Sequence, residues 1–250
     1  MADNRPVMLI TGAGRGIGAA VALAAAAGGY HVVLNHTTSG AAAQELAAEI
    51  RETGRRALPV HADVADEVAV TQMFATIDRH FGRLDVLVNN AGIAGGHGPL
   101  ASVTGAMLER LWAVNISGAF MCAREAAARM RTDTGGRGGS IINISSKAAV
   151  LGGANEWVHY AASKGAIDTM TVGLAKELAA VGVRVNGVRP GLIETDFHLH
   201  APPGRVVRMA PMIPMERSGS PAEVAAAVLW LAGAEASYVT GTFIDVTGGR

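Results

Sequence analysis

The sequence has 250 residues, of which half are hydrophobic and 17% are charged, and its 21 acidic residues balance its 21 basic residues. This balance gives no indication of a nucleic acid or an anionic membrane as a partner. Cys122 is the only cysteine, which excludes an intrachain disulfide and a cysteine-based metal cluster, and we expect a buried, inert thiol. We find neither a signal-peptide pattern nor an apolar run of about 18 residues, so we expect a cytoplasmic protein.

Short β-branched runs alternate with longer helical patterns along the whole sequence. In chain order, we predict strands at residues 7–11, 30–35, 57–61, 84–89, 141–145, 183–188 and 242–246. Between them we predict helices at residues 17–27, 41–53, 67–80, 105–130 and 159–180, and a last helix that Pro221 opens. Asp66 is the expected cap of the third helix.

This alternation predicts an α/β fold. We expect one Rossmann-type, doubly wound domain over residues 1–250, with a seven-stranded parallel sheet and helices on both faces. Residues 198–214 are rich in Pro, Met and basic side chains and show weak periodicity, so we predict a substrate lid at about 192–215. Ligands of such sheets bind at the carboxyl ends of the strands, where the strand order reverses.

The loop after the first predicted strand is the glycine-rich segment 11–18. Glycines let the backbone approach a pyrophosphate, and the helix that follows presents unpaired N–H groups to it. Glycines also occur where a helix simply packs close to a strand, but the position between a strand and a helix favours a dinucleotide site. The residues predicted to bind the cofactor here are Gly12, Gly14, Arg15, Gly16, Ile17 and Gly18.

The end of the second predicted strand bears on the choice of cofactor. No carboxylate occurs in residues 35–39, where an acidic residue would hold the ribose hydroxyls of NAD and repel a 2′-phosphate. Arg15 can pair with that phosphate, helped by the hydroxyls of residues 37–39, although a solvated arginine and a polar loop are the alternative. We therefore predict NADP(H), with NAD(H) as the alternative. The residues assigned to this part of the site are Asn35, His36 and Thr37.

Tyr160 and Lys164 are spaced one helical turn apart and share a helix face. A nearby ammonium lowers the pKa of a phenol from about 10, so the tyrosine can exchange a proton with a carbonyl or alcohol oxygen. Ser145 or Ser146 follows the fifth strand at the same edge and can hold the substrate oxygen. Asn115 lies inside a helical region, where it indicates either a kink or a water held for proton delivery.

With these motifs, the whole chain resembles the short-chain dehydrogenase/reductase family. The matching segments are Thr11-Gly12-x-x-x-Gly16-x-Gly18, Asp63-Val64, Asn89-Asn90-Ala91-Gly92, Asn115, Ser146, Tyr160-x-x-x-Lys164, Pro190-Gly191-x-x-x-Thr195 and the ending 241–249. The likeness is greatest to bacterial members described as glucose 1-dehydrogenase-like or uncharacterised oxidoreductases. The β-ketoacyl carrier-protein reductases are also similar.

The resemblance implies a catalytic tetrad of Asn115, Ser146, Tyr160 and Lys164, with Tyr160 as the acid/base. It implies that Lys164 also holds the nicotinamide ribose and that Asn115 holds a relay water. The further residues that it places at the cofactor are Asp63, Val64, Asn89, Asn90, Ala91, Gly92, Pro190, Gly191, Ile193 and Thr195. It also implies a homotetramer, with helices 105–130 and 159–180 and the C-terminal segment at the interfaces.

Two functions remain open on the sequence: an oxidoreductase of a small carbonyl or alcohol, and a cofactor-binding scaffold or redox sensor. The intact tetrad favours the first. His198 and His200 have no evident third ligand, so we expect no metal. Residues expected around the pocket mouth, either in contact with substrate or packed under the lid, are Gly95, Gly96, His97, Trp157 and Met209.

Overall fold

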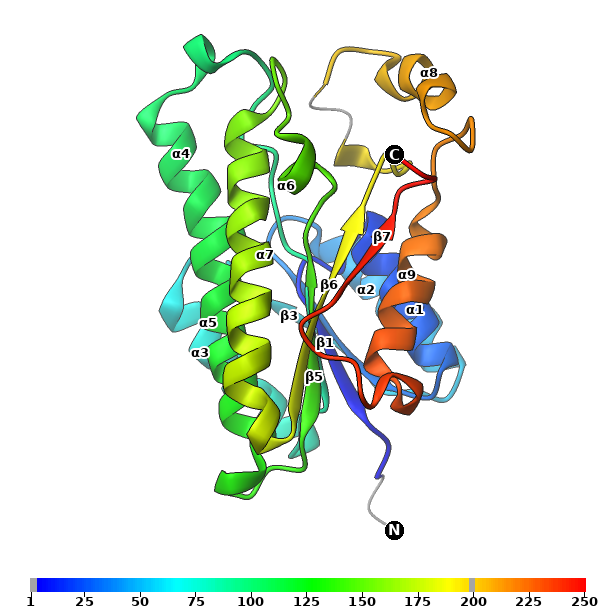
Figure 1. Ribbon diagram of the computed structural model, residues 1–250. Helices are drawn as coiled ribbons and strands as arrows, with labels where there is room; N and C mark the ends of the chain where they lie inside the picture. The colour runs from blue at the N-terminus through cyan, green and yellow to red at the C-terminus, as the bar shows by residue number, and fades with distance from the viewer. Residues whose placement is uncertain (1–3, 198–200) are drawn as a thin grey trace.

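The computed structural model describes residues 4–197 and 201–250, and a seven-stranded sheet runs through their centre (Figure 1). The strands are β1 (Val7–Ile10), β2 (His31–His36), β3 (Ala57–His61), β4 (Val86–Asn89), β5 (Gly139–Ile144), β6 (Val183–Pro190) and β7 (Phe243–Val246). Their order across the sheet is β3-β2-β1-β4-β5-β6-β7, and every neighbouring pair is parallel. The predicted seven-stranded parallel sheet is confirmed.

Helices cover both faces of the sheet, as predicted (Figure 1). They are α1 (Gly16–Ala27), α2 (Gly40–Glu52), α3 (Glu67–Phe81), α4 (Gly105–Trp112), α5 (Gly118–Met130), α6 (Ala148–Leu151), α7 (Val158–Leu178), α8 (Arg205–Met209) and α9 (Pro221–Ala232). One face carries α3, α5 and α7, and the other carries α1, α2 and α9. Among the described residues, no helix is both long and apolar enough to span a membrane.

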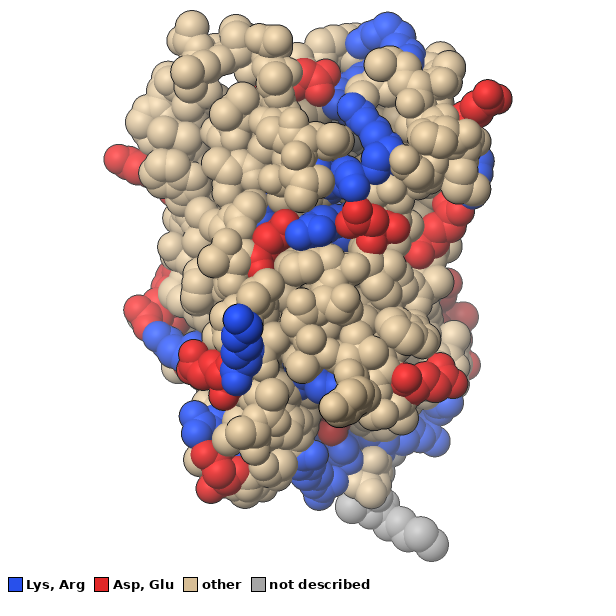
Figure 2. Space-filling view, viewed as in Figure 1, with Lys and Arg blue, Asp and Glu red and all other residues tan. Residues whose placement is uncertain are grey.

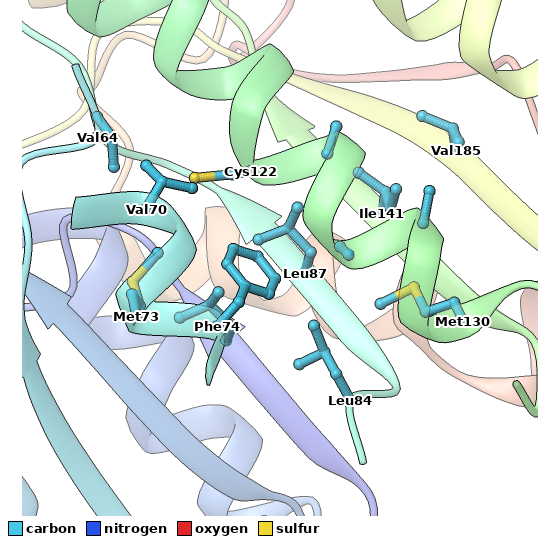
Figure 3. Packing of buried hydrophobic residues seen from close by; sticks show 14 of the residues in the cluster. Val64, Val70, Met73, Phe74, Leu84, Leu87, Cys122, Met130, Ile141 and Val185 are labelled. Carbon is cyan, nitrogen blue, oxygen red and sulfur yellow. The ribbon is translucent and has the colours of Figure 1, made fainter. Parts of the chain in front are cut away.

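The core lies in two layers, one on each side of the sheet. Figure 3 shows the layer under α3 and α5, where Phe74, Leu87 and Met130 pack together without solvent exposure. Each such side chain contributes roughly 1.5–3 kcal/mol through removal from water. Cys122 belongs to this layer, and burial raises the pKa of its thiol to about 12. The expected buried thiol is confirmed.

The sequence signals at helix starts hold in the structure. Asp66 caps α3 by accepting hydrogen bonds from the backbone N–H groups of Val68 and Ala69. Pro221 is the first residue of α9, whose capping box joins Ser220 and Glu223. Such contacts satisfy N–H groups that have no partner inside the helix.

Three segments differ from the prediction. The helix expected over residues 105–130 is divided by a π-helical turn at Ala113–Ser117. Residues 205–209 form the short helix α8 inside the stretch predicted as a lid or loop, and residues 148–151 form α6, which the sequence did not predict. Helices this short bury too few residues for a 3.6-residue period to become visible.

The sheet positions the site. β1 lies between β2 and β4, so the strand order reverses at β1 and leaves a crevice beyond the carboxyl ends of β1 and β4. Loops that are far apart in the sequence therefore meet at this edge.

Candidate active site

A cavity of about 420 Å³ occupies the expected edge of the sheet. The predicted residues that line it are Gly12, Arg15, Gly16, Ile17, His36, Thr37, Asp63, Val64, Asn90, Ala91, Gly92, Ser146, Tyr160, Lys164, Pro190, Gly191, Ile193 and Thr195. Five predicted residues do not line it: Gly14, Gly18, Asn35, Asn89 and Asn115. The structure places these five behind the cavity wall.

The glycine-rich turn is bonded to the loop after β4. The Thr11 hydroxyl accepts hydrogen bonds of 3.0 Å from the backbone N–H groups of Asn90 and Ala91. In return, the side-chain amide of Asn90 donates to the carbonyls of Thr11 and Gly12. Gly12 has a positive φ of 64°, and a Cβ there would lie only 3.0 Å from the Ala91 Cα. The approach of the two loops therefore requires glycine at this position.

Asn35 supports the same turn from behind. Its side-chain oxygen accepts a hydrogen bond from the Gly12 N–H at 3.2 Å, and its amide donates to the Ala62 carbonyl at 2.9 Å. A Cβ on Gly18 would come within 2.4 Å of the Gly12 carbonyl oxygen, and one on Gly14 would overlap the side chain of Ser39. Gly14, Gly18 and Asn35 therefore allow close packing of the turn and do not contact the cavity.

Asn89 has a similar supporting position under the loop after β4. Its amide donates to the Ala119 carbonyl on α5 and to the side-chain oxygen of Asn143 on β5. The amide of Asn143 in turn donates to the Thr171 hydroxyl on α7. This chain of buried amides ties the sheet to two helices.

At the end of β2 the cavity wall is basic and polar. His36 is only 8% exposed, and the centroid of its ring lies 5.6 Å from that of His61 on β3. Burial and, secondarily, the charge of His61 lower the pKa of His36. Arg15 is exposed, with its guanidinium 4.0 Å from the Asp196 carboxylate. Across the cavity, Asp63 is paired with Arg110 at 2.9 Å.

Tyr160 and Lys164 lie on α7 with Ser146 beside them, at the end of β5. The side chains of Ser146 and Tyr160 share a hydrogen bond, and Ser145 instead donates to the Lys164 carbonyl. Lys164 is 4% exposed, and its Nζ donates to the Ile144 carbonyl at 2.7 Å. That Nζ lies 5.8 Å from the centre of the Tyr160 ring.

Burial governs the pKa values of this pair. It raises the pKa of Tyr160 to about 12, against the opposing effect of the Ser146 hydrogen bond. It lowers the pKa of Lys164 to about 8, against the attraction of Asp168. The expectation that the lysine lowers the tyrosine pKa is therefore not met in this structure, because the loss of hydration of the phenolate is the larger effect.

Asn115 lies in the π-helical turn, which corresponds to the kink alternative. Its side-chain oxygen accepts from the Ile93 N–H at 2.8 Å, and its amide donates to the Ile93 carbonyl at 3.0 Å and the Ser163 hydroxyl at 3.1 Å. Both amide protons are used, so the side chain has none left to donate to a water. A Cβ on Gly92 would lie 3.4 Å from the Asn115 side-chain oxygen and 3.6 Å from the Lys164 Nζ.

A family model described as Enoyl-(Acyl carrier protein) reductase matches residues 12–250. The chain belongs to the short-chain dehydrogenase/reductase family. It is 48% identical to the "Uncharacterized oxidoreductase YgfF" of Escherichia coli over 98% of this chain and 99% of that one. It is 41% identical to the "3-oxoacyl-[acyl-carrier-protein] reductase" of Synechocystis over 97% of this chain and 96% of that one. Both groups correspond to the likeness that the sequence motifs indicated.

Solved structures of other proteins have a similar fold along nearly the whole chain. A blue fluorescent protein from a metagenomic library, solved in complex with NADPH, superposes with a TM-score of 0.89 at 37% identity over 100% of this chain and 99% of that one. A short-chain dehydrogenase/reductase variant from Serratia marcescens superposes with a TM-score of 0.90 at 33% identity, over 98% and 97% of the two chains.

In this short-chain dehydrogenase/reductase, the outer part of the cavity is aromatic. The ring of Phe197 lies 5.2 Å from that of Tyr160 and 5.7 Å from that of Trp157, measured between centroids. The guanidinium of Arg205, on α8, lies 4.5 Å from the centre of the Trp157 ring and pairs with Glu156 at 2.7 Å. Figure 2 shows Lys and Arg atoms along the hollow between the α6 side and the α8 side, with Asp and Glu atoms among them.

The sequence did not identify Glu156, Phe197 or Arg205 as site residues. No local motif joins positions 156 and 205, which lie 49 residues apart. Trp157 lines the cavity as expected, whereas Gly95, Gly96, His97 and Met209 do not, although the His97 ring packs edge-on against Trp157. His198 and His200 fall outside the described residues, and the described ones contain no cluster of metal-binding side chains.

Proposed function

We propose that this protein is an NADP(H)-dependent oxidoreductase that transfers a hydride between the dinucleotide and a small carbonyl or alcohol substrate. The observation that carries the proposal is the convergence of Ser146, Tyr160 and Lys164 on the cavity that also holds the glycine-rich turn. Family membership and the NADPH complex of a protein with the same fold support it.

The residues around the glycine-rich turn suit a dinucleotide. Helix α1 begins at Gly16, and its first turn lines the cavity. The N–H groups of this turn are suited to bind a pyrophosphate. Arg15 and His36 offer cationic or hydrogen-bonding contacts at the end of β2, where residues 35–39 contain no carboxylate. When bound, the nicotinamide supplies or accepts the hydride.

We assign the remaining predicted cofactor residues by their place on the wall. Asp63 and Val64 would contact the adenine, residues 90–92 the ribose, and residues 190–195 the nicotinamide side. Gly14, Gly18, Asn35 and Asn89 would act from behind the wall by fixing the turn and the loop after β4.

Tyr160 would serve as the general acid and base. A pKa of about 12 keeps its phenol protonated at neutral pH, so it can donate a proton to a carbonyl oxygen as the hydride arrives. Ser146, bonded to the same phenol, would orient the substrate oxygen. Lys164 would hold the cofactor ribose and favour the phenolate once charge develops on it.

Asn115 acts through other residues in this proposal. Its side chain bonds to both backbone groups of Ile93 and to Ser163, one residue before Lys164. We therefore give it the role of holding the loop after β4 against α7. The relay water that the family resemblance implied remains part of the proposal, and it would contact a group of Asn115 other than the two amide protons.

Two further predictions belong to the proposal. The described parts of the predicted lid at 192–215, which are residues 192–197 and 201–215, would cover the substrate, because Phe197 and Arg205 line the cavity and pack on Trp157. A homotetramer would cover apolar side chains that the single chain exposes, among them Trp112 on α4 and Phe120 on α5, which are 43% and 47% exposed. A monomer by light scattering would refute this assembly.

The proposal is tested by two measurements on the purified protein. Affinities for NADPH and NADH, measured by fluorescence titration, should differ in favour of NADPH. Sugars, keto esters and quinones should then be screened for oxidation of NADPH by its absorbance. Preference for NADH would overturn the cofactor assignment, and tight NADPH binding without any turnover would favour the scaffold or sensor function.

A further inference from the structure

We propose that His36 takes up a proton when a dinucleotide with a 2′-phosphate binds, so that affinity for this dinucleotide falls as pH rises while affinity for NADH does not. This inference rests on the proposed NADP(H) site and adds a proton linkage to it. It makes His36 a determinant of cofactor preference that depends on pH.

The position of His36 is the first part of the argument. It is the last residue of β2, it lines the cavity, and it is more than nine-tenths buried. Its Nδ1 has no hydrogen-bond partner among the described residues. A Cβ on Gly40, the first residue of α2, would lie 3.3 Å from the His36 Cε1 and 3.7 Å from the Nδ1. The ring therefore packs directly against the start of α2.

The start of α2 is the second part. This 13-residue helix has no acidic residue in its first turn, and the side chain of its N-cap residue, Ser39, makes no capping hydrogen bond. Its first N–H groups thus remain available to an anion, and the helix dipole favours negative charge there. Ser39 also packs so tightly on Gly14 that no side chain fits at position 14, which places the helix start against the glycine-rich turn.

The groups that face His36 decide its protonation. From β3, the centroid of the His61 ring lies 5.6 Å from that of His36, and its charge disfavours a second positive charge there. From the turn after β1, Arg15 lines the same cavity. Asp63, which also lines the cavity, is already paired with Arg110. Burial and, after it, the charge of His61 lower the pKa of His36 in the empty site, so the ring is mostly neutral at pH 7.

A 2′-phosphate reverses this balance. It carries about two negative charges above its own pKa of about 6, and an opposite charge within a few ångström favours the imidazolium. The ring then captures a proton from solvent. Between the pKa of the free site and that of the occupied site, affinity should fall by up to about tenfold per pH unit. NADH brings no charge to this position and should show no such slope.

The experiment uses calorimetric titration of the full-length protein from pH 7 to 8.5, where the phosphate is almost entirely a dianion. The probes are NADPH, NADH and adenosine 2′,5′-bisphosphate, which lacks the nicotinamide. Adenosine 5′-monophosphate is the matched control for the bisphosphate, because the two differ only in the 2′-phosphate. Two buffers of different ionisation enthalpy give the number of protons taken up. We expect uptake approaching one proton for NADPH and the bisphosphate near neutral pH, and none for NADH.

Two variants assign the proton to a residue. H36N should lose both the pH slope and the proton uptake, and a single cooperative thermal unfolding transition should show that it is folded. The matched control H61N should keep the uptake, with the slope moved to higher pH because one opposing charge is gone. A slope that survives in H36N, or NADPH binding without proton uptake by the unmodified protein, would overturn the proposal. Binding of neither dinucleotide would refute the proposed function itself.

Discussion

The two ends of the cavity are built in different ways. At the cofactor end, buried strand ends are joined by hydrogen bonds between side chains and backbone, as in the bonds between Thr11 and Asn90. At the substrate end, loops and short helices meet largely through side-chain contacts, as in the pair of Glu156 and Arg205, with single backbone bonds such as that from the Gly98 N–H to the Glu156 carbonyl. Hydrogen bonds to the backbone hold the strand ends in one arrangement. A contact between two side chains, in contrast, can be changed by a single substitution without moving the backbone. We therefore expect substitutions at the cofactor end to cost more than substitutions at the substrate end.

The largest expected effect comes from Tyr160, which lies between the two ends. Y160F should lower kcat by roughly 10²–10⁴-fold, because it removes the proton that a positioned acid donates. Affinity for NADPH should stay within about twofold, since the phenyl ring keeps its packing against Phe197. Steady-state kinetics with fluorescence titration would measure both, and unchanged turnover would contradict the assigned role.

A pH experiment on Lys164 follows. Burial lowers its pKa from 10.5 to about 8, so the unfolded chain holds this proton more tightly than the folded one. The free energy of unfolding should therefore rise with pH between about 8 and 10.5, by up to about 3 kcal/mol relative to K164M. Urea denaturation of both proteins over the lower part of this range gives the difference. The contribution from Cys122 is common to the two and cancels, and the comparison ends at pH 9.5 because Tyr160 stays largely protonated below that pH in both states.

Removal of a single hydroxyl at the cofactor end should be costly. T11V leaves the buried N–H groups of Asn90 and Ala91 without their acceptor, which should lower the free energy of unfolding by about 1–3 kcal/mol and weaken NADPH binding. S140A is the matched control, because the Ser140 hydroxyl is equally buried but bonds to Leu231, away from the cavity. Equal loss of NADPH affinity in both variants would argue against the special position of Thr11.

The smallest effect is expected at the substrate end. E156Q should raise KM by about threefold to tenfold, since it leaves the Arg205 guanidinium without its carboxylate, and should not change the affinity for NADPH. The reversed pair, E156R with R205E, should recover part of the loss. Failure of the reversed pair to recover, combined with weaker NADPH binding, would remove the distinction between the two ends.

Most strands and helix starts could be predicted from the sequence. Periodicity located the strands, and cap residues such as Asp66 and Pro221 marked helix starts, because these signals are local. The sequence did not reveal that Asn35 supports the glycine-rich turn from behind, since that role depends on a contact across 23 residues. Nor did it give the direction of the Tyr160 pKa, which depends on burial that only the assembled cavity creates.

Cys122 has a practical consequence for the study of this site. It is the sole cysteine of the sequence, it has no exposed surface, and burial holds its thiol in the protonated form, which reacts slowly with alkylating reagents. Cysteines introduced at exposed positions would therefore react much faster than Cys122 in the folded protein. Dyes attached at Val207 on α8 and at Val150 on α6, which are both exposed, would report the distance across the cavity mouth by energy transfer without removal of the native residue.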